Sequence, residues 1–376
     1  MLQLPLKPDQ DIITELVSHV GSEPKARQDD VVREFYDHVT TVPSWVDWGR
    51  IRRGQEVFLR NAPGCGMALM YLSLVGGFGA PKINKVLTST GYLANKHTMR
   101  RLLETSQMII DCMQPDGLIP LTGIGWKSCL RVRFLHGKVR QRLRSSERWN
   151  AEEWGIPINQ EDMIATLLSF SFNIVVALSI MGINLTKGEV DDYLHLWRYI
   201  GYLSGVRDDL NPCISYEISR ATVESIVVHL IQPDESSIFL AHHSIESLMD
   251  ERNVAVRWSL PAHYQMARML MGDELADCLQ LPASELYRVH HLALFGVLRF
   301  ISRLSYLPVI GSTIIDFNRR LLADVNRRGL GDTRADFSMS RKCSPSPTNK
   351  QTIKQASKLN KMQIIQIPRE TTPLTT

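Results

Sequence analysis

The chain has 376 residues, of which 44% are hydrophobic and 22% charged, and its net charge at neutral pH is +4. This is the composition of an ordinary globular protein with enough apolar residues for a large core. Residues 341–376 hold seven lysines and arginines but one acid, so residues 1–340 contain 36 basic and 38 acidic residues. The main body is therefore close to neutral, which argues against a nucleic-acid-binding protein with a basic surface.

The six cysteines are scattered along the chain, and none of them forms a CxxC pair. This spacing argues against zinc-finger and iron–sulfur sites and against a disulfide framework. The N-terminal residues include Pro5, Pro8 and Asp9 and lack the apolar stretch of a signal peptide or an N-terminal anchor. We therefore expect a protein of a reducing compartment, the cytoplasm.

The first quarter of the chain alternates amphipathic segments with turns. Residues 10–40 predict one or two amphipathic helices, and residues 42–53 predict a loop that enters a helix. Residues 54–74 predict an apolar helix that a turn at residues 63–66 interrupts. The sequence GGFGAP at residues 76–81 predicts a second turn.

The remainder of the body is a series of predicted helices. A hydrophobic stripe predicts a helix over residues 96–113, which Pro115 and Gly117 end. A loop containing Gly123 and Gly125 follows, and residues 128–144 then predict a strongly basic helix. Further helices are expected at residues 161–181, 187–203, 222–232, 236–250, 262–271 and 285–305.

No run of alternating β-branched residues demands a sheet, so the expected fold class is all-α, with a single large helical domain. We expect an N-terminal helical extension over residues 1–40 and the helical domain over residues 41–335. Residues 336–376 are rich in Ser, Pro, Lys and Thr and predict a disordered basic tail.

Residues 163–183 form a stretch of 21 positions without a charged residue, which is long enough to span a bilayer. The stretch also contains hydroxyl and amide side chains, among them Thr166, Ser171 and Asn173, and an acidic region follows it instead of a basic flank. We therefore favour a buried central helix over a membrane span.

The basic helix carries a histidine between two arginines. Arg133, His136 and Arg140 are spaced i, i+3 and i+7, so they lie on one face of that helix. The arginines should lower the pKa of the imidazole and keep it neutral, as a ligand to iron must be. The same spacing also occurs on a solvated basic helix face with an incidental histidine, and the motif alone leaves both interpretations open.

The surrounding segments resemble a known family of helical proteins. The residues that carry the resemblance are RxxHxxxR at Arg133–Arg140, PINQED at residues 157–162, HLW at residues 195–197, and glycines and aspartates up to Pro212. They are similar to the catalytic domain shared by rubber oxygenase (latex-clearing protein) and the MpaB-type oxygenase. The resemblance implies a globin-like haem-binding helical core, with His136 as the protein ligand to the iron of haem b and with Arg133 and Arg140 holding the cofactor or the ligand helix.

The same resemblance implies a distal side for the haem on the helix at residues 96–113. The family has an RxxKT element there, and this chain has Arg101, Glu104 and Thr105. Arg101 and Thr105 match the family and share one helix face, and they would orient bound oxygen. Glu104 replaces a lysine that caps the iron in the family's closed state. We expect Arg101 to pair with Glu104 and to leave the iron accessible to external ligands.

Other candidate residues have alternative interpretations. His97 could reach the distal face, or it could simply start a helix. The pairs His242–His243 and His290–His291 are sequence neighbours, which point about 100° apart on a helix and make poor bidentate sites. Asp191–Asp192 and Asp208–Asp209 resemble the magnesium sites of all-α prenyl or terpene enzymes, but neither pair has the DDxxD spacing.

The expected function is that of a haem b-dependent oxygenase that uses O₂ to oxidise an apolar isoprenoid or polyketide-type substrate, with cleavage of a C=C bond as the specific hypothesis. The partners are then a small apolar substrate and O₂, without nucleic acid. The resemblance also makes association with the ER membrane an alternative to a cytoplasmic location. The alternatives are a haem-binding paralogue without catalysis and a magnesium-dependent prenyl enzyme.

Overall fold

The computed structural model describes residues 30–90, 98–147, 149–249 and 258–331, together with Ile13, Leu16, Val17 and Val20. All regular structure in these residues is helical, which confirms the expected all-α fold. The predicted tail at 336–376, most of the predicted extension at 1–40, and His97 lie outside the described residues.

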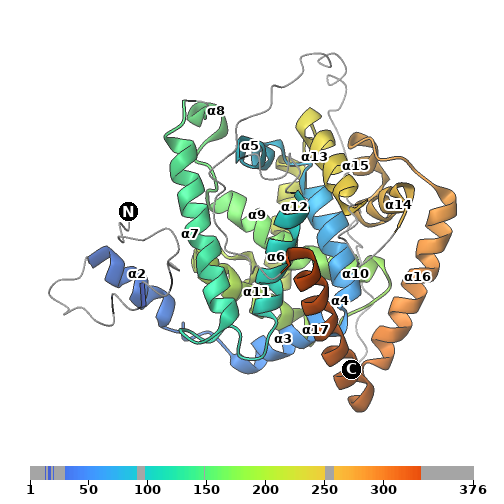
Figure 1. Ribbon diagram of the computed structural model, residues 1–376, viewed down its shortest axis with the longest axis horizontal. Coiled ribbons are helices and arrows are strands. Elements are labelled where there is room, and N and C mark those ends of the chain that lie inside the picture. The colour runs from blue at the N-terminus through green and yellow to red at the C-terminus, as the bar shows by residue number, and fades with distance from the viewer. Residues whose placement is uncertain are drawn as a thin grey trace.

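The helices form one body in which α7 lies along one side, α6 and α17 cross the front, and α16 runs along the opposite edge (Figure 1). In chain order the helices are α2 (Asp30–Thr40), α3 (Trp48–Arg60), α4 (Ala62–Met67), η2 (Ala68–Val75), α5 (Pro81–Thr90), α6 (Thr98–Cys112), α7 (Ile124–Arg144), α8 (Ala151–Trp154), α9 (Gln160–Phe170), α10 (Phe172–Ile180), α11 (Lys187–Ser204), η3 (Asp208–Leu210), η4 (Pro212–Ile214), α12 (Tyr216–His229), α13 (Glu235–Glu246), η5 (Ser247–Met249), α14 (Leu260–Met271), α15 (Asp273–Cys278), α16 (Glu285–Leu304) and α17 (Pro308–Leu330).

The centre of the core is the crossing of α3 and α11. A Cβ atom placed on Gly54 of α3 would lie 2.6 Å from the backbone oxygen of Asp192 and 2.9 Å from Cβ of Leu196, both on α11. The two helices therefore approach closely because Gly54 has no side chain. Arg50 and Arg53, on the same helix as Gly54, form ion pairs with the Asp192 carboxylate.

The predicted turn at residues 63–66 was wrong. Pro63 occupies the first turn of α4, where a proline needs no backbone N–H partner, so the chain stays helical and breaks at Asn61 instead. The helix then continues as the π-helix η2, which a simple helical period could not reveal. The second predicted turn is confirmed at residues 78–80.

The apolar helix predicted over residues 161–181 is two helices, α9 and α10, which meet at Ser171. The fully buried Ser171 hydroxyl donates a hydrogen bond to the carbonyl of Leu167, 2.8 Å away, and the backbone leaves helical geometry there. Residues Gln160–Ile180 are long and apolar enough to cross a membrane, and 56% of their most apolar window is buried inside the protein. The packing of α9 and α10 against η2 agrees with a central core position.

The basic helix also begins earlier than predicted, at Ile124, and includes Gly125. A Cβ atom on Gly125 would lie 2.6 Å from Cα of Cys112, so the glycine serves close packing of α7 on α6 rather than a loop. The C-terminal end of α11 follows the prediction, because Gly205 ends it with a φ of 99°.

Two buried histidines make the stability of the fold depend on pH. His195 is 5% exposed, and its Nε2 accepts a hydrogen bond from the backbone N–H of Asp47 at 3.0 Å. His263 is 2% exposed, with Nδ1 2.6 Å from the hydroxyl oxygen of Tyr71. Burial is the main cause that lowers the pKa of each from 6.5 to about 4.

Because these folded-state pKa values are depressed, the unfolded chain takes up the protons more readily as the pH falls. Their contribution to stability is complete above pH 6.5 and is lost as the pH falls towards 4. We expect the free energy of unfolding, measured by urea titration, to fall by a few kcal/mol over this range. His195→Gln, whose amide oxygen can still accept the Asp47 N–H, should show a shallower dependence, and an unchanged slope would contradict the assignment.

Candidate functional site

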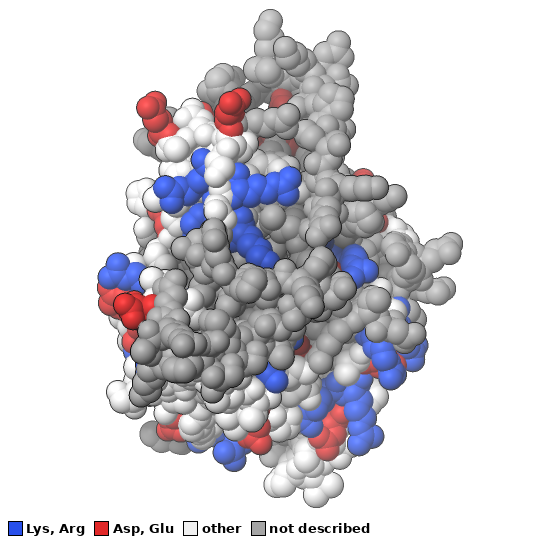
Figure 2. Space-filling model, turned by 60° about the vertical axis from the view of Figure 1, so that its left-hand side comes forward, with Lys and Arg blue, Asp and Glu red and all other residues white. Residues whose placement is uncertain are grey.

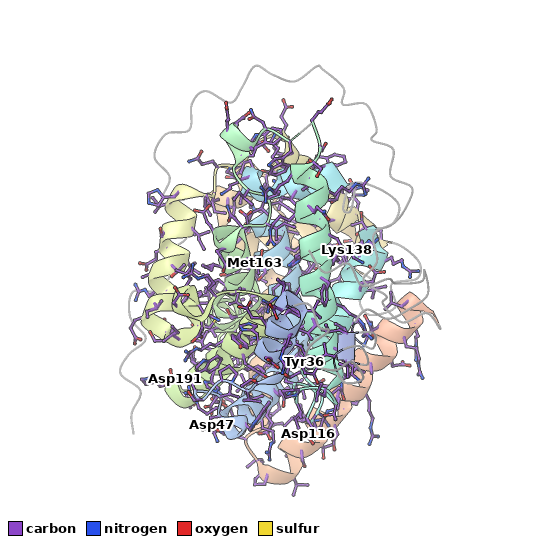
Figure 3. All side chains as sticks on the ribbon, turned by 90° about the vertical axis from the view of Figure 1, so that its left-hand side faces the viewer. Tyr36, Asp47, Asp116, Lys138, Met163 and Asp191 are labelled. Carbon is purple, nitrogen blue, oxygen red and sulfur yellow. The ribbon has the colours of Figure 1, made fainter. Side chains whose placement is uncertain are left out.

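The candidate site lies on α7, and α6 is fixed against the first half of this helix. Cys112 Sγ lies 3.5 Å from Cys129 Sγ, and the Ser128 hydroxyl donates to the carboxylate of Asp111 at 2.6 Å. All four side chains are buried. Since the end of α6 meets the beginning of α7, the two helices run antiparallel. Figure 3 views the protein from the α7 side, with Lys138 of this helix labelled.

His136 is held in α7 as a neutral imidazole. Its pKa is lowered from 6.5 to about 4, first by burial and second by the positive charge of Arg140. The lowered pKa agrees with the predicted neutral imidazole. However, the prediction attributed the shift to both arginines, whereas burial is its main cause and Arg133 does not contribute. Nδ1 of His136 is buried without a hydrogen-bond partner in the described part of the chain. A neutral imidazole whose buried Nδ1 has no partner among the described residues is suited to binding a metal.

Arg133 lies one turn earlier on the same face, and it is also incompletely satisfied. Its Nη1 atom is buried and has no hydrogen-bond partner among the described residues. Its guanidinium carbon lies 5.1 Å from the centre of the Phe35 ring, and its side chain packs over Gly205 at the end of α11. Burial lowers the pKa of its guanidinium below the usual value. An arginine with an unused buried donor can bind an anionic group of a ligand.

Arg140 has a different environment from Arg133. Its guanidinium donates to the backbone carbonyls of Pro157 and Ile158, and its Nη2 lies 3.7 Å from Met163 Sδ of α9. Arg140 therefore ties the ligand helix to the segment that precedes α9. Two roles were expected for Arg140, holding the cofactor or holding the ligand helix. These contacts agree with holding the helix, since they use its Nε and Nη2 donors.

The PINQED sequence explains how that segment is shaped. The Asn159 side chain accepts a hydrogen bond from the backbone N–H of Asp162, and the Asp162 carboxylate accepts one from the N–H of Asn159. This capping box starts α9. It also directs the Pro157 and Ile158 carbonyls towards Arg140, so the motif helps to position α7.

The three residues expected on the distal side lie on α6, but they do not share one environment. Glu104 is 4% exposed, and its carboxylate forms ion pairs with Arg101, as predicted, and with Arg100 at 3.1 Å. Thr105 is exposed, and its hydroxyl donates to the carbonyl of Arg101. The role of Arg100 was missed, although its i, i+4 spacing to Glu104 is a recognisable signal.

The predicted site residues of α6 and those of α7 lie on two helices that contact each other through apolar side chains. Leu103 and Met108 of α6 contact a cluster with Val132 and Leu135 of α7 and with Leu330 of α17. Within the described ranges, no hydrogen bond or ion pair joins Arg101, Glu104 or Thr105 to His136. The structure thus places the two predicted groups on adjacent helices without direct polar contact.

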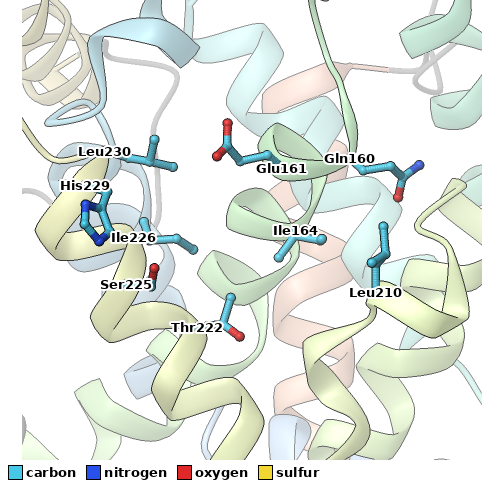
Figure 4. Close-up of a pocket in the computed structure, with 9 residues that line it drawn as sticks. All are labelled: Gln160, Glu161, Ile164, Leu210, Thr222, Ser225, Ile226, His229 and Leu230. Carbon is cyan, nitrogen blue, oxygen red and sulfur yellow. The ribbon is translucent and has the colours of Figure 1, made fainter.

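The helix surface is open at Gly137, the residue that follows His136. A Cβ atom on Gly137 would have no heavy atom within 4 Å. A separate pocket of about 450 Å³ opens between α9 and α12 and is lined by residues that include Gln160, Ile164, Ser225 and His229 (Figure 4). None of the predicted site residues lines it, so this pocket is distinct from the His136 region.

The remaining candidates have structural partners. The Asp192 carboxylate binds Arg50 and Arg53, Asp208 binds Arg198, and Asp209 binds Arg207. His242 contacts Tyr264 and the carbonyls of Leu279 and Gln280, and His291 contacts the carbonyl of Ala262. In the part of the chain that is described, no cluster of three or more His, Cys, Asp or Glu side chains forms a metal site.

Comparison with known proteins confirms the family resemblance of the sequence. The family described as "ER-bound oxygenase mpaB/B'/Rubber oxygenase, catalytic domain" matches residues 55–301. A rubber oxygenase of Streptomyces sp. (strain K30) is 26% identical over 204 residues, which is 53% of this chain and 49% of that protein. The chain thus matches about half the length of this relative.

The fold is similar to that of a solved structure, the latex clearing protein LCP in its closed state. The TM-score is 0.60 at 18% sequence identity, over 79% of this chain and 80% of that one. Because the family match spans well over half of the chain, the protein belongs to the family of the ER-bound oxygenase mpaB/B' and rubber oxygenase catalytic domain.

Proposed function

We propose that this protein is a haem b-dependent oxygenase in which His136 would be the protein ligand to the iron. The observation that carries the proposal is that His136 and Arg133, one turn apart on α7, both have buried nitrogen atoms without a hydrogen-bond partner in the described ranges. A neutral imidazole beside an unsatisfied guanidinium fits the iron and a propionate of one haem group. The family membership supports an oxygenase that acts on an apolar, isoprenoid-like substrate.

The protein groups have separate tasks in this proposal. His136 would donate a nitrogen lone pair, which burial keeps free of a proton at neutral pH. Arg133 would bind a carboxylate of the cofactor, and Arg140 would hold α7 against the turn before α9. When bound, haem b would supply the iron that activates O₂. In the proposed cleavage, one O₂ is consumed for each C=C bond, and each carbon of that bond becomes a carbonyl.

Arg101 is the group on α6 that would orient oxygen or substrate. Its ion pair with Glu104 fixes the guanidinium on the buried side of the helix. Thr105, which was expected to help, is exposed and donates to the Arg101 carbonyl, so it would have to change rotamer to take part. Glu104 would act through Arg101 and Arg100 as a positioning residue.

The proposal is tested by the absorption spectrum of the purified full-length chain and by its oxygen chemistry. We expect one haem b per chain and ¹⁸O from ¹⁸O₂ in both carbonyl products of a polyisoprenoid or an unsaturated polyketide. A haem spectrum without oxygen uptake would favour the paralogue without catalysis. Absence of haem from protein produced with ample haem supply would contradict the proposal and favour the prenyl-enzyme alternative.

The position of Glu104 leads to a prediction about ligand access. Because Arg100 and Arg101 both bind its carboxylate, Glu104 should not coordinate the iron as the family lysine does. We expect the haem-loaded protein to bind imidazole in a single kinetic phase whose rate increases linearly with imidazole concentration. This is measured by stopped-flow absorbance. A rate that reaches a plateau would indicate a preceding conformational step and contradict the prediction.

A further inference from the structure

One side of helix α16 packs on the body of the protein, and the opposite side exposes large apolar side chains. On the covered side, His291 is fully buried against α14 and Ser302 donates to Asn61 at 2.8 Å. On the opposite side, four large apolar side chains are 54–75% exposed: Leu286, Val289, Val297 and Phe300. Their spacing of 3, 8 and 3 residues places them on one helix face.

The exposed apolar surface continues around the corner into α17. Between the two helices and along α17, five further large side chains are 37–78% exposed: Leu307, Val309, Ile310, Phe317 and Leu321. We refer to these nine residues as the α16–α17 apolar face. The two helices meet at the lower end of the molecule in Figure 1, so this face includes a protruding corner. An exposed apolar surface of this extent marks an interaction site.

The charge of this hairpin differs from that of the rest of the protein. Residues 285–330 contain seven arginines and three acids, a net charge of +4, whereas residues 1–284 contain 28 basic and 33 acidic residues. Of the arginines beside the apolar face, Arg299, Arg303 and Arg320 have no carboxylate within 4.0 Å among the described residues. In Figure 2 the lowest part of the molecule is uncharged, and lysine and arginine side chains lie just above it together with some acidic ones.

We propose that the α16–α17 apolar face docks on the surface of an anionic lipid bilayer. The apolar side chains would enter the boundary between headgroups and acyl chains, and the arginines would reach lipid phosphates at the level of the headgroups. A protruding corner fits a fluid bilayer, which needs no complementary protein shape. Pairing of this face with a second copy of the chain would bring two hairpins of charge +4 together, which electrostatic repulsion opposes.

The experiment is flotation of the full-length protein with vesicles of phosphatidylcholine alone or with about 30% phosphatidylserine. We expect binding to the anionic vesicles and little to the neutral ones. Phe300→Glu combined with Val309→Glu should weaken binding by about tenfold or more. The matched control is Phe239→Glu with Val228→Glu, since these residues are 50% and 67% exposed elsewhere and the charge change is the same.

Several results would overturn the proposal. Absence of binding to either kind of vesicle would do so, and so would equal loss of binding in the two double variants, which would place the contact outside the α16–α17 apolar face. Analytical ultracentrifugation adds an independent readout. A concentration-dependent dimer that Phe300→Glu with Val309→Glu abolishes, together with no vesicle binding, would assign the face to a second copy of this chain.

Discussion

Replacement of His136 by alanine is expected to abolish stoichiometric haem binding while the helical content stays close to that of the wild type. The imidazole is the group proposed to hold the iron, whereas its buried Nδ1 makes no hydrogen bond to the described residues that the fold would lose. The loss in stability should stay near 1 kcal/mol, as for the truncation of a partly buried side chain without partners. Haem content is measured by the pyridine haemochrome assay, and helical content by circular dichroism.

The control for His136→Ala is Gly137→Ala on the same helix. No heavy atom lies within 4 Å of the added Cβ, and alanine is favoured over glycine in a helix by about 1 kcal/mol. This variant should bind haem normally and unfold at a slightly higher temperature. Added imidazole should partly restore haem to His136→Ala. Full haem occupancy of His136→Ala without imidazole would show that another residue is the ligand.

Gly54→Val is expected to have the largest effect on stability. Its Cβ atom would lie 2.6 Å from the Asp192 backbone oxygen, so α3 and α11 would have to separate. Backbone cannot move aside as a flexible side chain can, and α3 and α11 form the most extensive helix pair of the core. We expect a loss of about 3 kcal/mol or more in the free energy of unfolding, measured by urea titration.

Gly66→Val is the matched substitution for Gly54→Val. Gly66 also lies in a helix, and no heavy atom is found within 4 Å of the position of its Cβ. The free energy of unfolding of the Gly66→Val variant should change by less than about 1 kcal/mol, because the substitution alters only helix propensity. Equal unfolding midpoints for the two valine variants would mean that α3 and α11 are not closely packed at Gly54.

The sequence alone predicted those features that depend on neighbours along the chain. The apolar period of α6 and the left-handed glycine that ends α11 are local signals, and both helices lie where they were expected. The ion pair between Arg101 and Glu104 is equally local, since one helical turn brings the two side chains together. The family resemblance rested on short motifs of the same kind, and the family match agrees with it.

Local signals failed where packing across the core decided the conformation. Residues 63–66 were predicted as a turn because Pro and Gly often break helices, but the fold uses Pro63 at the start of α4. Ser171 had no recognisable signal, and its buried hydroxyl contacts the Leu167 carbonyl and Cys213 Sγ where α9 ends. The apolar period alone could not distinguish one long helix from two.

For the site, the sequence by itself determined that Arg133, His136 and Arg140 share one face of a helix, because helical geometry fixes that face. Only the tertiary structure decided that the three side chains differ in their hydrogen-bond partners and in their burial. Arg140 donates from Nε and Nη2 to carbonyls before α9, and Arg133 retains a buried nitrogen without a partner in the described part of the chain. Burial lowers the pKa of His136 more than the charge of Arg140 does. Hydrogen-bond partners and desolvation depend on residues distant in the chain, so spacing along one helix cannot specify them.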